Sequence, residues 1–289
     1  MRIRLISVPY DSGHFRGRMG AGPEHLLKHG LKDRLREAGH VPVAASVHSA
    51  AAFQAENETA FELMGAIAAE VARATADGEL PIVLAGNCTS SVGTVAGLGS
   101  ARVGVVWFDS HGDFNTPETT TTGFLDGMAV AILTGHCWRQ AAGRVEGFAP
   151  LPERCVLLAG ARDFDAEEQA RLENSAVVRI SETRIQRQGA DSAMGTALEA
   201  LAREVDGVYV HVDLDVLDAD MAPANPFSTP GGLTPEQLLD CLETVARHVP
   251  ILAAGVTAYD PKCDPEGTAT DVAIKAVVQL AACREAVYP

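Results

Sequence analysis

The chain has 289 residues, of which 47% are hydrophobic and 21% charged, and its formal net charge is −15. The length and apolar content allow one large domain with a sizeable core, whereas the negative charge argues against nucleic acid or an anionic membrane as a partner, and no apolar run approaches the roughly 20 residues that span a bilayer. Six scattered cysteines without a CxxC motif, together with an N-terminus that lacks a secretory signal, predict a cytoplasmic protein with reduced thiols.

Apolar β-branched runs alternate with amphipathic stretches along the whole chain. The expected strands are 2–9, 41–47, 80–85, 103–108, 155–161, 177–180, 208–212 and 250–256. The expected helices are 24–38, 58–75, 125–134, 192–204, 270–286, one that begins near Ser90 and one that begins at Thr234-Pro235. This alternation predicts an α/β protein with three α/β/α layers and a largely parallel central sheet. No linker or repeat interrupts the chain, so residues 1–289 are expected to form a single domain.

Three metal-ligand types follow the buried strand 103–108. Asp109, His111 and Asp113 are spaced two apart, and alternate side chains of an extended chain point to the same side. Carboxylate and imidazole donors suit a divalent metal ion. The plainer alternative is a solvated loop with incidental acids.

A second cluster repeats this arrangement after strand 208–212. His211, Asp213 and Asp215 are again two apart. In an open parallel sheet, ligands bind beyond the carboxyl ends of the strands, where both clusters are expected to lie. Burying so many unpaired carboxylates would be costly, so the pattern favours a site with two metal ions and bridging carboxylates over incidental acids.

At these residues the sequence resembles the ureohydrolase family, which comprises arginases, agmatinases and formiminoglutamases. The resemblance rests on DSHGDFNTPETTTTG, on HVDLDVLDAD and on the N-terminal RGRMGAGPEHLL. It implies an arginase-like metallohydrolase fold, two Mn²⁺ ions, hydrolysis of a guanidino carbon, and a homo-oligomer, either a trimer or a hexamer. Hard Mn²⁺ suits these donors, and a metal pair can activate a shared water molecule.

The resemblance also assigns roles by position. Asp109 and Asp213 would bridge both metals, Asp113 would bind one, and His111 and Asp215 the other. The substrate's α-carboxylate would be bound by Asn115, Thr120 and Thr122, and its α-amino group by Asp165 and, over a longer distance, Glu168. Amide and hydroxyl donors suit a carboxylate, and acids suit an ammonium. The alternative for the threonines is a polar loop without a role.

Two departures from the family pattern affect the metal site. Cys88 stands where the family has a histidine ligand, so one metal position should be weaker or biased toward Zn²⁺, unless Cys88 is a buried thiol without a metal contact. His211 stands where the family usually has serine. It could donate to a liganding carboxylate, supply the imidazole that Cys88 lacks, or be a satisfied core histidine.

Two further departures affect catalysis. Asp126 replaces the histidine that shuttles protons in arginases, and a carboxylate has the wrong ordinary pKa for that task. Ala258 replaces the glutamate that pairs with the guanidinium, although Asp260, two residues on, could substitute.

These departures favour a substrate less basic than arginine. N-hydroxylation lowers guanidine basicity, and the pattern is similar to that of Nω-hydroxy-L-arginine amidinohydrolases. The predicted function is therefore a dinuclear manganese amidinohydrolase, with a small guanidino amino acid as its partner and catalytic roles for Asp126 and His211. The alternatives are an arginase, another ureohydrolase acting on agmatine or a formimino amino acid, and a catalytically decayed, metal-poor binding protein on the same fold.

Overall fold

The computed structural model describes residues 1–99 and 101–287; residue 100 and residues 288–289, which belong to the predicted domain, lie outside this part. Its main feature is an eight-stranded sheet with the order β4-β1-β5-β10-β9-β6-β7-β8, in which every neighbouring pair is parallel. The strands are β1 Arg2–Val8, β4 Val41–Ser46, β5 Leu80–Ala85, β6 Val103–Phe108, β7 Val156–Ala159, β8 Val178–Ile180, β9 Gly207–Asp213 and β10 Ile251–Thr257. A short hairpin pairs β2 Tyr10–Asp11 with β3 His14–Phe15.

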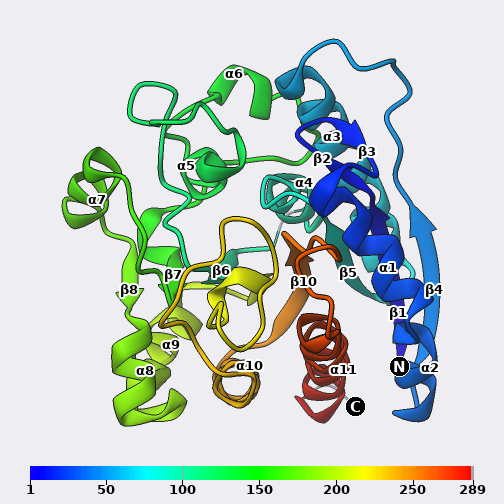
Figure 1. The fold of residues 1–289 in the computed structure, drawn as a ribbon, viewed down its shortest axis with the longest axis vertical. Coiled ribbons are helices and arrows are strands. Elements are labelled where there is room, and N and C mark those ends of the chain that lie inside the picture. Colours follow the sequence, from blue (N-terminus) through cyan, green and yellow to red (C-terminus); the bar gives the residue numbers. More distant parts are fainter. Residues whose placement is uncertain (100, 288–289) are drawn as a thin grey trace.

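Helices cover both faces of this sheet (Figure 1). They are α1 Gly22–Lys28, α2 Leu31–Glu37, α3 Glu56–Ala76, α4 Ser90–Gly97, α5 Ala129–Leu133, α6 Arg139–Ala142, α7 Ala166–Glu173, α8 Glu182–Gln188, α9 Ala190–Glu204, α10 Pro235–His248 and α11 Thr268–Val287. Short 3-10 turns occur at Arg18–Ala21, Asp126–Met128, Glu153–Cys155 and Leu214–Val216. The predicted three-layer α/β/α class with a parallel sheet is confirmed.

The strands are buried on both sides, which divides the core into two. Val106 and Phe108 of β6 pack in the cluster that α1, α2, α8, α9, α10 and α11 cover. Val105 and Trp107, which alternate with them along the strand, pack on the opposite face in the cluster that α3, α4, α5, α6 and α7 cover. Since side chains alternate along a strand, this explains why the parallel strands read as continuous apolar runs.

Two expected helices were wrong in extent. The predicted helix 24–38 is divided into α1 and α2, because Gly30 adopts a left-handed conformation with φ 92° between them. The predicted helix 125–134 consists of the 3-10 turn Asp126–Met128 followed by α5. The helices α6, α7 and α8 were not predicted from the sequence.

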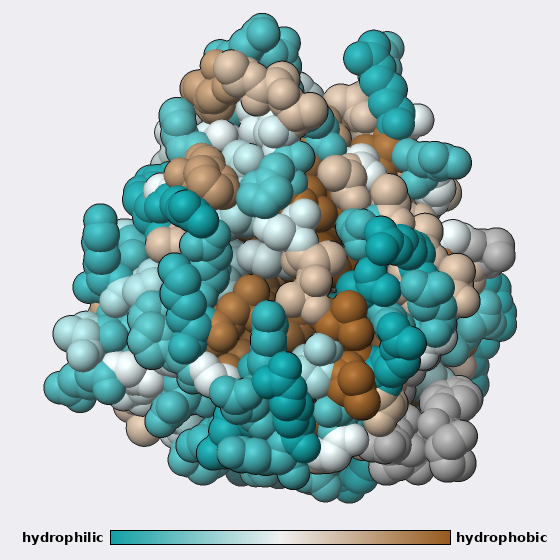
Figure 2. All heavy atoms as spheres, turned by 90° about the vertical axis from the view of Figure 1, so that its right-hand side faces the viewer, coloured by the Kyte–Doolittle hydropathy of each residue, from teal (hydrophilic) through white to brown (hydrophobic). Residues whose placement is uncertain are grey.

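The edge strand β4 lies on the face shown in Figure 2, where polar side chains cover most of the surface and apolar ones reach it in patches. Val41 of β4 is 57% exposed. Within the described residues, no helix combines the length and apolar character that crossing a membrane requires.

A buried ion pair links β1 to the residue before β5, and its removal is expected to destabilise the fold. Arg4 and Glu79 are 5% and 1% exposed, and Nε of Arg4 lies 2.5 Å from Oε2 of Glu79. Arg4→Met would leave the buried carboxylate of Glu79 with Arg2, at 2.6 Å, as its remaining ionic partner, so we expect a loss of about 3 kcal/mol in the free energy of unfolding, measured in urea. Arg34→Met, which removes an exposed pair with Glu37, is the control and should change stability by less than about 1 kcal/mol.

The same pair should show a defined pH dependence. Burial alone would raise the pKa of Glu79, but its hydrogen bond and charge interaction with Arg4 hold that pKa below its ordinary value of 4.5. The stability from this pair is therefore present above pH 4.5 and lost as the pH falls through the lowered pKa. An Arg4→Met deficit that stays constant down to the acid limit would contradict this assignment.

Candidate active site

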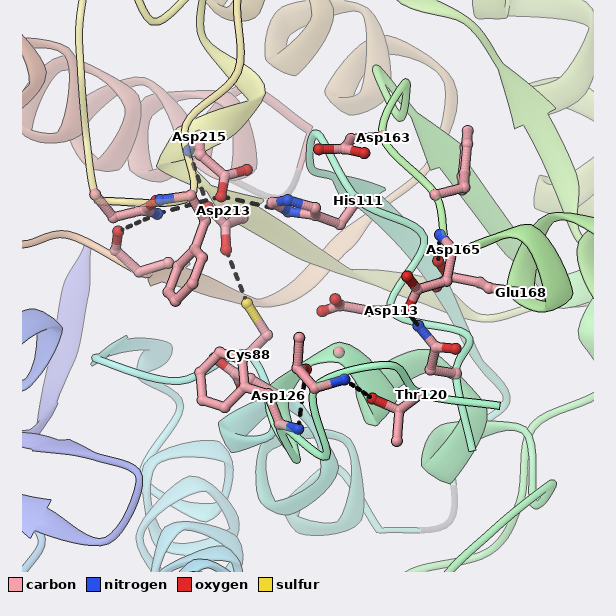
Figure 3. A pocket seen from close by; sticks show the side chains of 18 of the residues that line it. Cys88, His111, Asp113, Thr120, Asp126, Asp163, Asp165, Glu168, Asp213 and Asp215 are labelled. Carbon is pink, nitrogen blue, oxygen red and sulfur yellow. Dashed lines mark hydrogen bonds and ion pairs between the residues drawn. The ribbon is translucent and has the colours of Figure 1, made fainter. Parts of the chain in front are cut away.

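A cavity of about 210 Å³ opens at the carboxyl ends of the central strands (Figure 3). Loops that follow β5, β6, β7, β9 and β10 line it, as expected for an open parallel sheet. Eleven of the thirteen predicted site residues line the cavity: Cys88, His111, Asp113, Asn115, Thr120, Thr122, Asp126, Asp165, Glu168, Asp213 and Asp215. Asp109 and His211 lie buried outside the lining.

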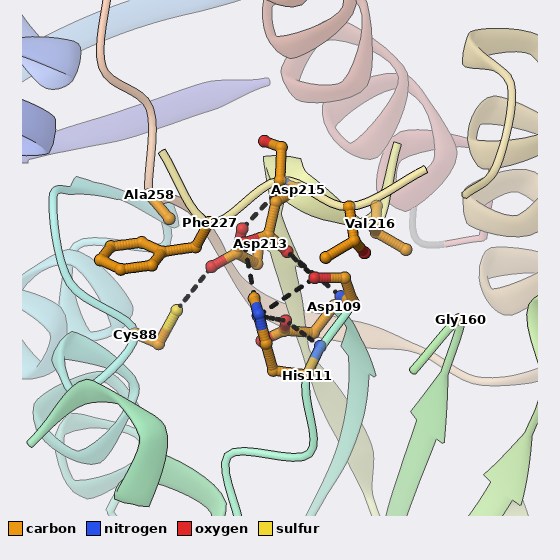
Figure 4. A network of polar contacts seen from close by, with 12 residues as sticks. Cys88, Asp109, His111, Gly160, Asp213, Asp215, Val216, Phe227 and Ala258 are labelled. Carbon is orange, nitrogen blue, oxygen red and sulfur yellow. Dashed lines mark hydrogen bonds and ion pairs between the residues drawn. The ribbon is translucent and has the colours of Figure 1, made fainter. Parts of the chain in front are cut away.

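Metal-ligand atoms come together in two groups, and Figure 4 shows Cys88, Asp109, His111, Asp213 and Asp215 gathered at one point. Within each group all ligand atoms lie within 4.8 Å of one another; the first group is Cys88, Asp109, His211 and Asp213, and the second is Asp109, His111 and Asp215. Asp109 belongs to both groups, as a bridging ligand would. Of the described residues, Asp213 belongs only to the first group, and Asp113 to neither.

The electrostatics of this cluster call for cations. Burial, followed by the charges of neighbouring aspartates, raises the pKa of Asp113 and Asp213 well above the ordinary value. Oδ2 of Asp113 is buried and has no hydrogen-bond partner. Buried carboxylates that repel one another and lack donors fit the hard, oxygen-binding metal ions that the sequence predicted.

His111 and Asp215 form an ion pair in the second group. Burial alone would lower the pKa of His111, but the charges of Asp215 and Asp109 raise it to about 10. Burial likewise opposes ionisation of Asp215, yet His111 and hydrogen bonds from Ser110 keep its pKa below the ordinary value. A metal that binds His111 therefore has to displace its proton.

Asp113 sits in a strained backbone conformation that the loop around it enforces. Its φ is 49°, which is uncommon for a residue with a side chain. Its carbonyl oxygen accepts hydrogen bonds from the backbone N–H groups of Val130 and Ala131, at 2.9 and 3.1 Å. The start of α5 thus fixes the turn that directs this carboxylate into the cavity.

Cys88 and His211 occupy neighbouring buried positions. The thiol of Cys88 donates to Oδ2 of Asp213 at 3.0 Å and contacts Oγ1 of Thr257 at 3.3 Å. His211 is fully buried, stacks on Trp107 and hydrogen-bonds through Nε2 to Thr257. The ring is enclosed and does not line the cavity, so a role for His211 would have to act through its buried neighbours and stays a prediction.

The residues predicted to bind the amino-acid end lie together at one wall. Nδ2 of Asn115 donates to Oδ2 of Asp165 at 3.1 Å. Oγ1 of Thr120 accepts from the backbone N–H groups of Thr122 and Gly123, and Oγ1 of Thr122 accepts from that of Phe124. Because these hydroxyls accept from the backbone, their own protons remain available for a ligand carboxylate.

Glu168 holds the backbone of this wall through hydrogen bonds. Its carboxylate is 3% exposed and accepts from the backbone N–H groups of Phe114, at 2.8 Å, and Asp165, at 3.3 Å. The contact with Asp165 also caps the N-terminus of α7. Burial raises the pKa of Glu168 to about 7.

Asp126 differs from what its residue type alone suggested. Its oxygens accept from Nδ2 of Asn87 and from the backbone N–H of Thr89, both at 2.9 Å. Burial nevertheless raises the pKa of Asp126 to about 7. The expectation for Asp126 rested on the ordinary pKa of a carboxyl, and burial moves this pKa toward the range that suits proton exchange near neutral pH.

Asp260 does not replace the missing glutamate. It is buried outside the cavity lining, where its N–H donates to the carbonyl of Ala224 and its Oδ1 accepts from the N–H of Lys262. At Ala258 the cavity wall thus offers only a methyl group.

Several lining or supporting residues were missed. Asn225 donates to Oδ2 of Asp215 at 3.2 Å and to the carbonyl of Ala258 at 2.8 Å, which joins the β9 and β10 loops. Met19 and Phe227 add apolar surface to the cavity. Met19 lies in the 3-10 turn Arg18–Ala21 and Asn225 in an irregular segment, and neither has a periodic signal, whereas Thr257, directly after the predicted strand 250–256, could have been found from its position.

Comparison with known proteins agrees with this geometry. The sequence model of the arginase family matches residues 1–283. The arginase of Bacillus caldovelox is 30% identical over 286 residues, which cover 94% of this chain and 95% of that protein. The crystal structure of arginase from Bacillus cereus has a TM-score of 0.88 at 26% identity and covers 97% of this chain and 98% of that one. The agmatine ureohydrolase of Thermoplasma volcanium, at 20% identity and a TM-score of 0.70 over 99% of this chain and 90% of that one, is similar in fold alone.

Proposed function

This chain belongs to the arginase family, and we propose that it is a dinuclear manganese amidinohydrolase whose favoured substrate is Nω-hydroxy-L-arginine. As a family member it is a metal-dependent hydrolase that acts on linear amidines. The reaction adds water to the guanidino carbon and breaks its bond to the δ-nitrogen. With the hydroxylated substrate, the products are L-ornithine and hydroxyurea.

We assign two metal ions to this cluster, with ligand sets that follow the family resemblance and differ from the two donor groups: Asp113 replaces His211 in the first, and Asp213 is added to the second. One ion would bind Cys88, Asp109, Asp113 and Asp213, and the other Asp109, His111, Asp213 and Asp215. When bound, the pair would supply an activated water molecule and stabilise negative charge on the reacting carbon. The orphaned Oδ2 of Asp113 supports this assignment.

Metal binding should strengthen as the pH rises from 6 to 9. His111, with a pKa of about 10, and the thiol of Cys88 both carry protons at neutral pH, and a metal must displace them. We therefore expect Mn²⁺ affinity to increase with pH and proton release to accompany binding. Calorimetric titrations in two buffers of different ionisation enthalpy measure this release; identical heats in both buffers would exclude it.

One cavity wall suits the amino-acid end of the substrate. The hydroxyls of Thr120 and Thr122 and the amide of Asn115 would donate to the α-carboxylate, and Asp165 would accept from the α-amino group. Glu168 would hold Asp165 in place through the backbone. These groups favour an α-amino acid over agmatine, which has no carboxylate.

The observation that carries the substrate assignment is the missing anion at Ala258. Asp260 is hydrogen-bonded outside the cavity lining, so it does not take the place of the glutamate. A fully charged guanidinium would lose its ion pair at this wall, whereas a hydroxyguanidine can enter neutral.

Asp126 would supply the proton that the leaving amine needs. It lines the cavity, and its pKa of about 7 suits proton exchange near neutral pH. Asn87 and Thr89 fix its orientation through hydrogen bonds to both carboxylate oxygens.

Product analysis of Mn²⁺-loaded protein tests this proposal. L-Arginine, Nω-hydroxy-L-arginine, agmatine and N-formimino-L-glutamate are supplied separately, and urea, hydroxyurea and formamide are quantified. Hydroxyurea release in excess of the other products supports the assignment. Turnover of agmatine alone would contradict the amino-acid site, and protein without bound metal or turnover would identify a binding protein.

A further inference from the structure

Behind Cys88 lies a chain of fully buried side chains joined by hydrogen bonds. Sγ of Cys88 lies 3.3 Å from Oγ1 of Thr257, which lies 3.1 Å from Nε2 of His211. Nδ1 of His211 lies 2.8 Å from the hydroxyl of Tyr209. The exposed fraction of each of these side chains is between 0% and 2%.

We propose that Tyr209, His211 and Thr257 are positioning residues that direct a hydrogen-bond donor at the sulfur of Cys88 and so fit it to bind a thiophilic divalent ion. This inference rests on the proposed role of Cys88 as a metal ligand. It gives His211 a role that needs neither contact with substrate nor direct ligation.

The direction of the chain follows from counting donors. Within the described residues, the one hydrogen-bond partner found for the Tyr209 hydroxyl is Nδ1 of His211. A buried hydroxyl needs an acceptor for its proton, so Tyr209 donates to Nδ1 of His211. The neutral imidazole then carries its own proton on Nε2. Nε2–H donates to Oγ1 of Thr257, whose own proton is left for the sulfur.

The hydrogen bonds of Cys88 are consistent with these donor and acceptor directions. Its S–H donates to Oδ2 of Asp213 while its sulfur accepts from Thr257. A metal ion shared by Cys88 and Asp213 would take the place of the thiol proton, which passes to solvent, and the donor from Thr257 would remain. Every hydrogen bond of the chain thus keeps its direction when the ion binds.

The sheet holds the chain in place. Trp107 and His211 are register partners in β6 and β9, and their rings stack with centroids 3.5 Å apart. Gly255 is the register partner of His211 in β10, and a Cβ at Gly255 would lie 2.2 Å from the Tyr209 hydroxyl oxygen. Glycine therefore leaves the space that Tyr209 needs to reach the imidazole.

Co²⁺ is the probe for this arrangement because thiolate ligation to it gives a near-ultraviolet charge-transfer band. The full-length protein is titrated with Co²⁺, and the band position and dissociation constant are measured. Thr257→Val removes the donor with little change of volume, and Thr257→Ser keeps it. Thr244→Val is the control, because Thr244 is 1% exposed but its hydroxyl donates to the carbonyl of Asp240 in α10, away from the cavity.

We expect Thr257→Val to weaken Co²⁺ binding about 10- to 100-fold and to shift the band to longer wavelength, since sulfur without a donor releases charge more readily. Thr257→Ser and Thr244→Val should match the original protein. Tyr209→Phe, which removes only a hydroxyl, should produce a smaller shift in the same direction and keeps the test valid if Thr257→Val does not fold.

Cys88→Ser separates this inference from the proposed ligand role. Loss of the band in Cys88→Ser, with Thr257→Val and Tyr209→Phe indistinguishable from the original protein, would overturn the positioning chain but leave Cys88 as a ligand. A band that persists in Cys88→Ser would show that sulfur does not bind the metal and would overturn both.

Discussion

Asp213→Asn is expected to lower turnover by at least about 1,000-fold. Asp213 lies at the junction of the two proposed metal positions, where it accepts from the thiol of Cys88 and from the N–H of Asp215. The amide keeps the shape but removes the charge that would hold two cations together. Since tenfold in rate corresponds to about 1.4 kcal/mol, a loss of about 4 kcal/mol of stabilisation in the transition state is enough.

The same substitution separates catalysis from folding. Burial and the charges of Asp215 and Asp109 disfavour ionised Asp213 in the metal-free protein, so its neutralisation should not lower the metal-free melting temperature. Mn²⁺ should stabilise the original protein by about 2.7 kcal/mol at 100 times its Kd and the variant by much less. Equal melting shifts in both proteins would show that Asp213 has a structural role only.

Nω-hydroxy-L-arginine is expected to be hydrolysed with a kcat/KM at least about tenfold above that of L-arginine. A buried charge without its partner costs several kcal/mol, and each kcal/mol corresponds to about fivefold in rate. In the proposed site, the wall formed by Asn115, Thr120 and Asp165 would bind the same amino-acid end in both substrates and so would not discriminate between them. In the proposed mechanism Asp126 would deliver a proton in both cases, so the expected preference depends on Ala258.

Ala258→Glu tests that dependence. Ala258 lines the cavity, so a glutamate at this position would place a carboxylate beside the guanidino group. We expect it to shift the ratio of the two kcat/KM values toward L-arginine, whereas Ala258→Gln, similar in shape but uncharged, should not. Equal ratios in both variants would mean that charge at this wall does not determine the preference.

The fold could be predicted because parallel strands that are buried on both faces produce long apolar runs. β5 and β6 begin and end where the pattern placed them. The two-residue spacing after each strand singled out the metal-ligand candidates, but turns and not an extended chain direct them, since Asp215 lies in the 3-10 turn Leu214–Val216 and Asp113 has a φ of 49°. Short helices such as α6 could not be predicted, since four residues carry no periodicity.

The burial and the pKa of individual site residues, by contrast, could not be predicted from residue type. Burial moves the pKa of Asp126 to about 7 and encloses His211 between Trp107 and Thr257. Asn225 reaches the site from the irregular loop after Asp215, where no sequence pattern singles it out. These features depend on which segments meet in three dimensions.

A competition assay tests the central claim most directly. Mn²⁺-loaded protein is given equimolar L-arginine and Nω-hydroxy-L-arginine at concentrations below both KM values, and hydroxyurea and urea are measured in the same sample. Their initial ratio equals the ratio of the two kcat/KM values. The absent anion at Ala258 predicts a ratio of hydroxyurea to urea of at least about ten; a ratio of one or less would contradict it.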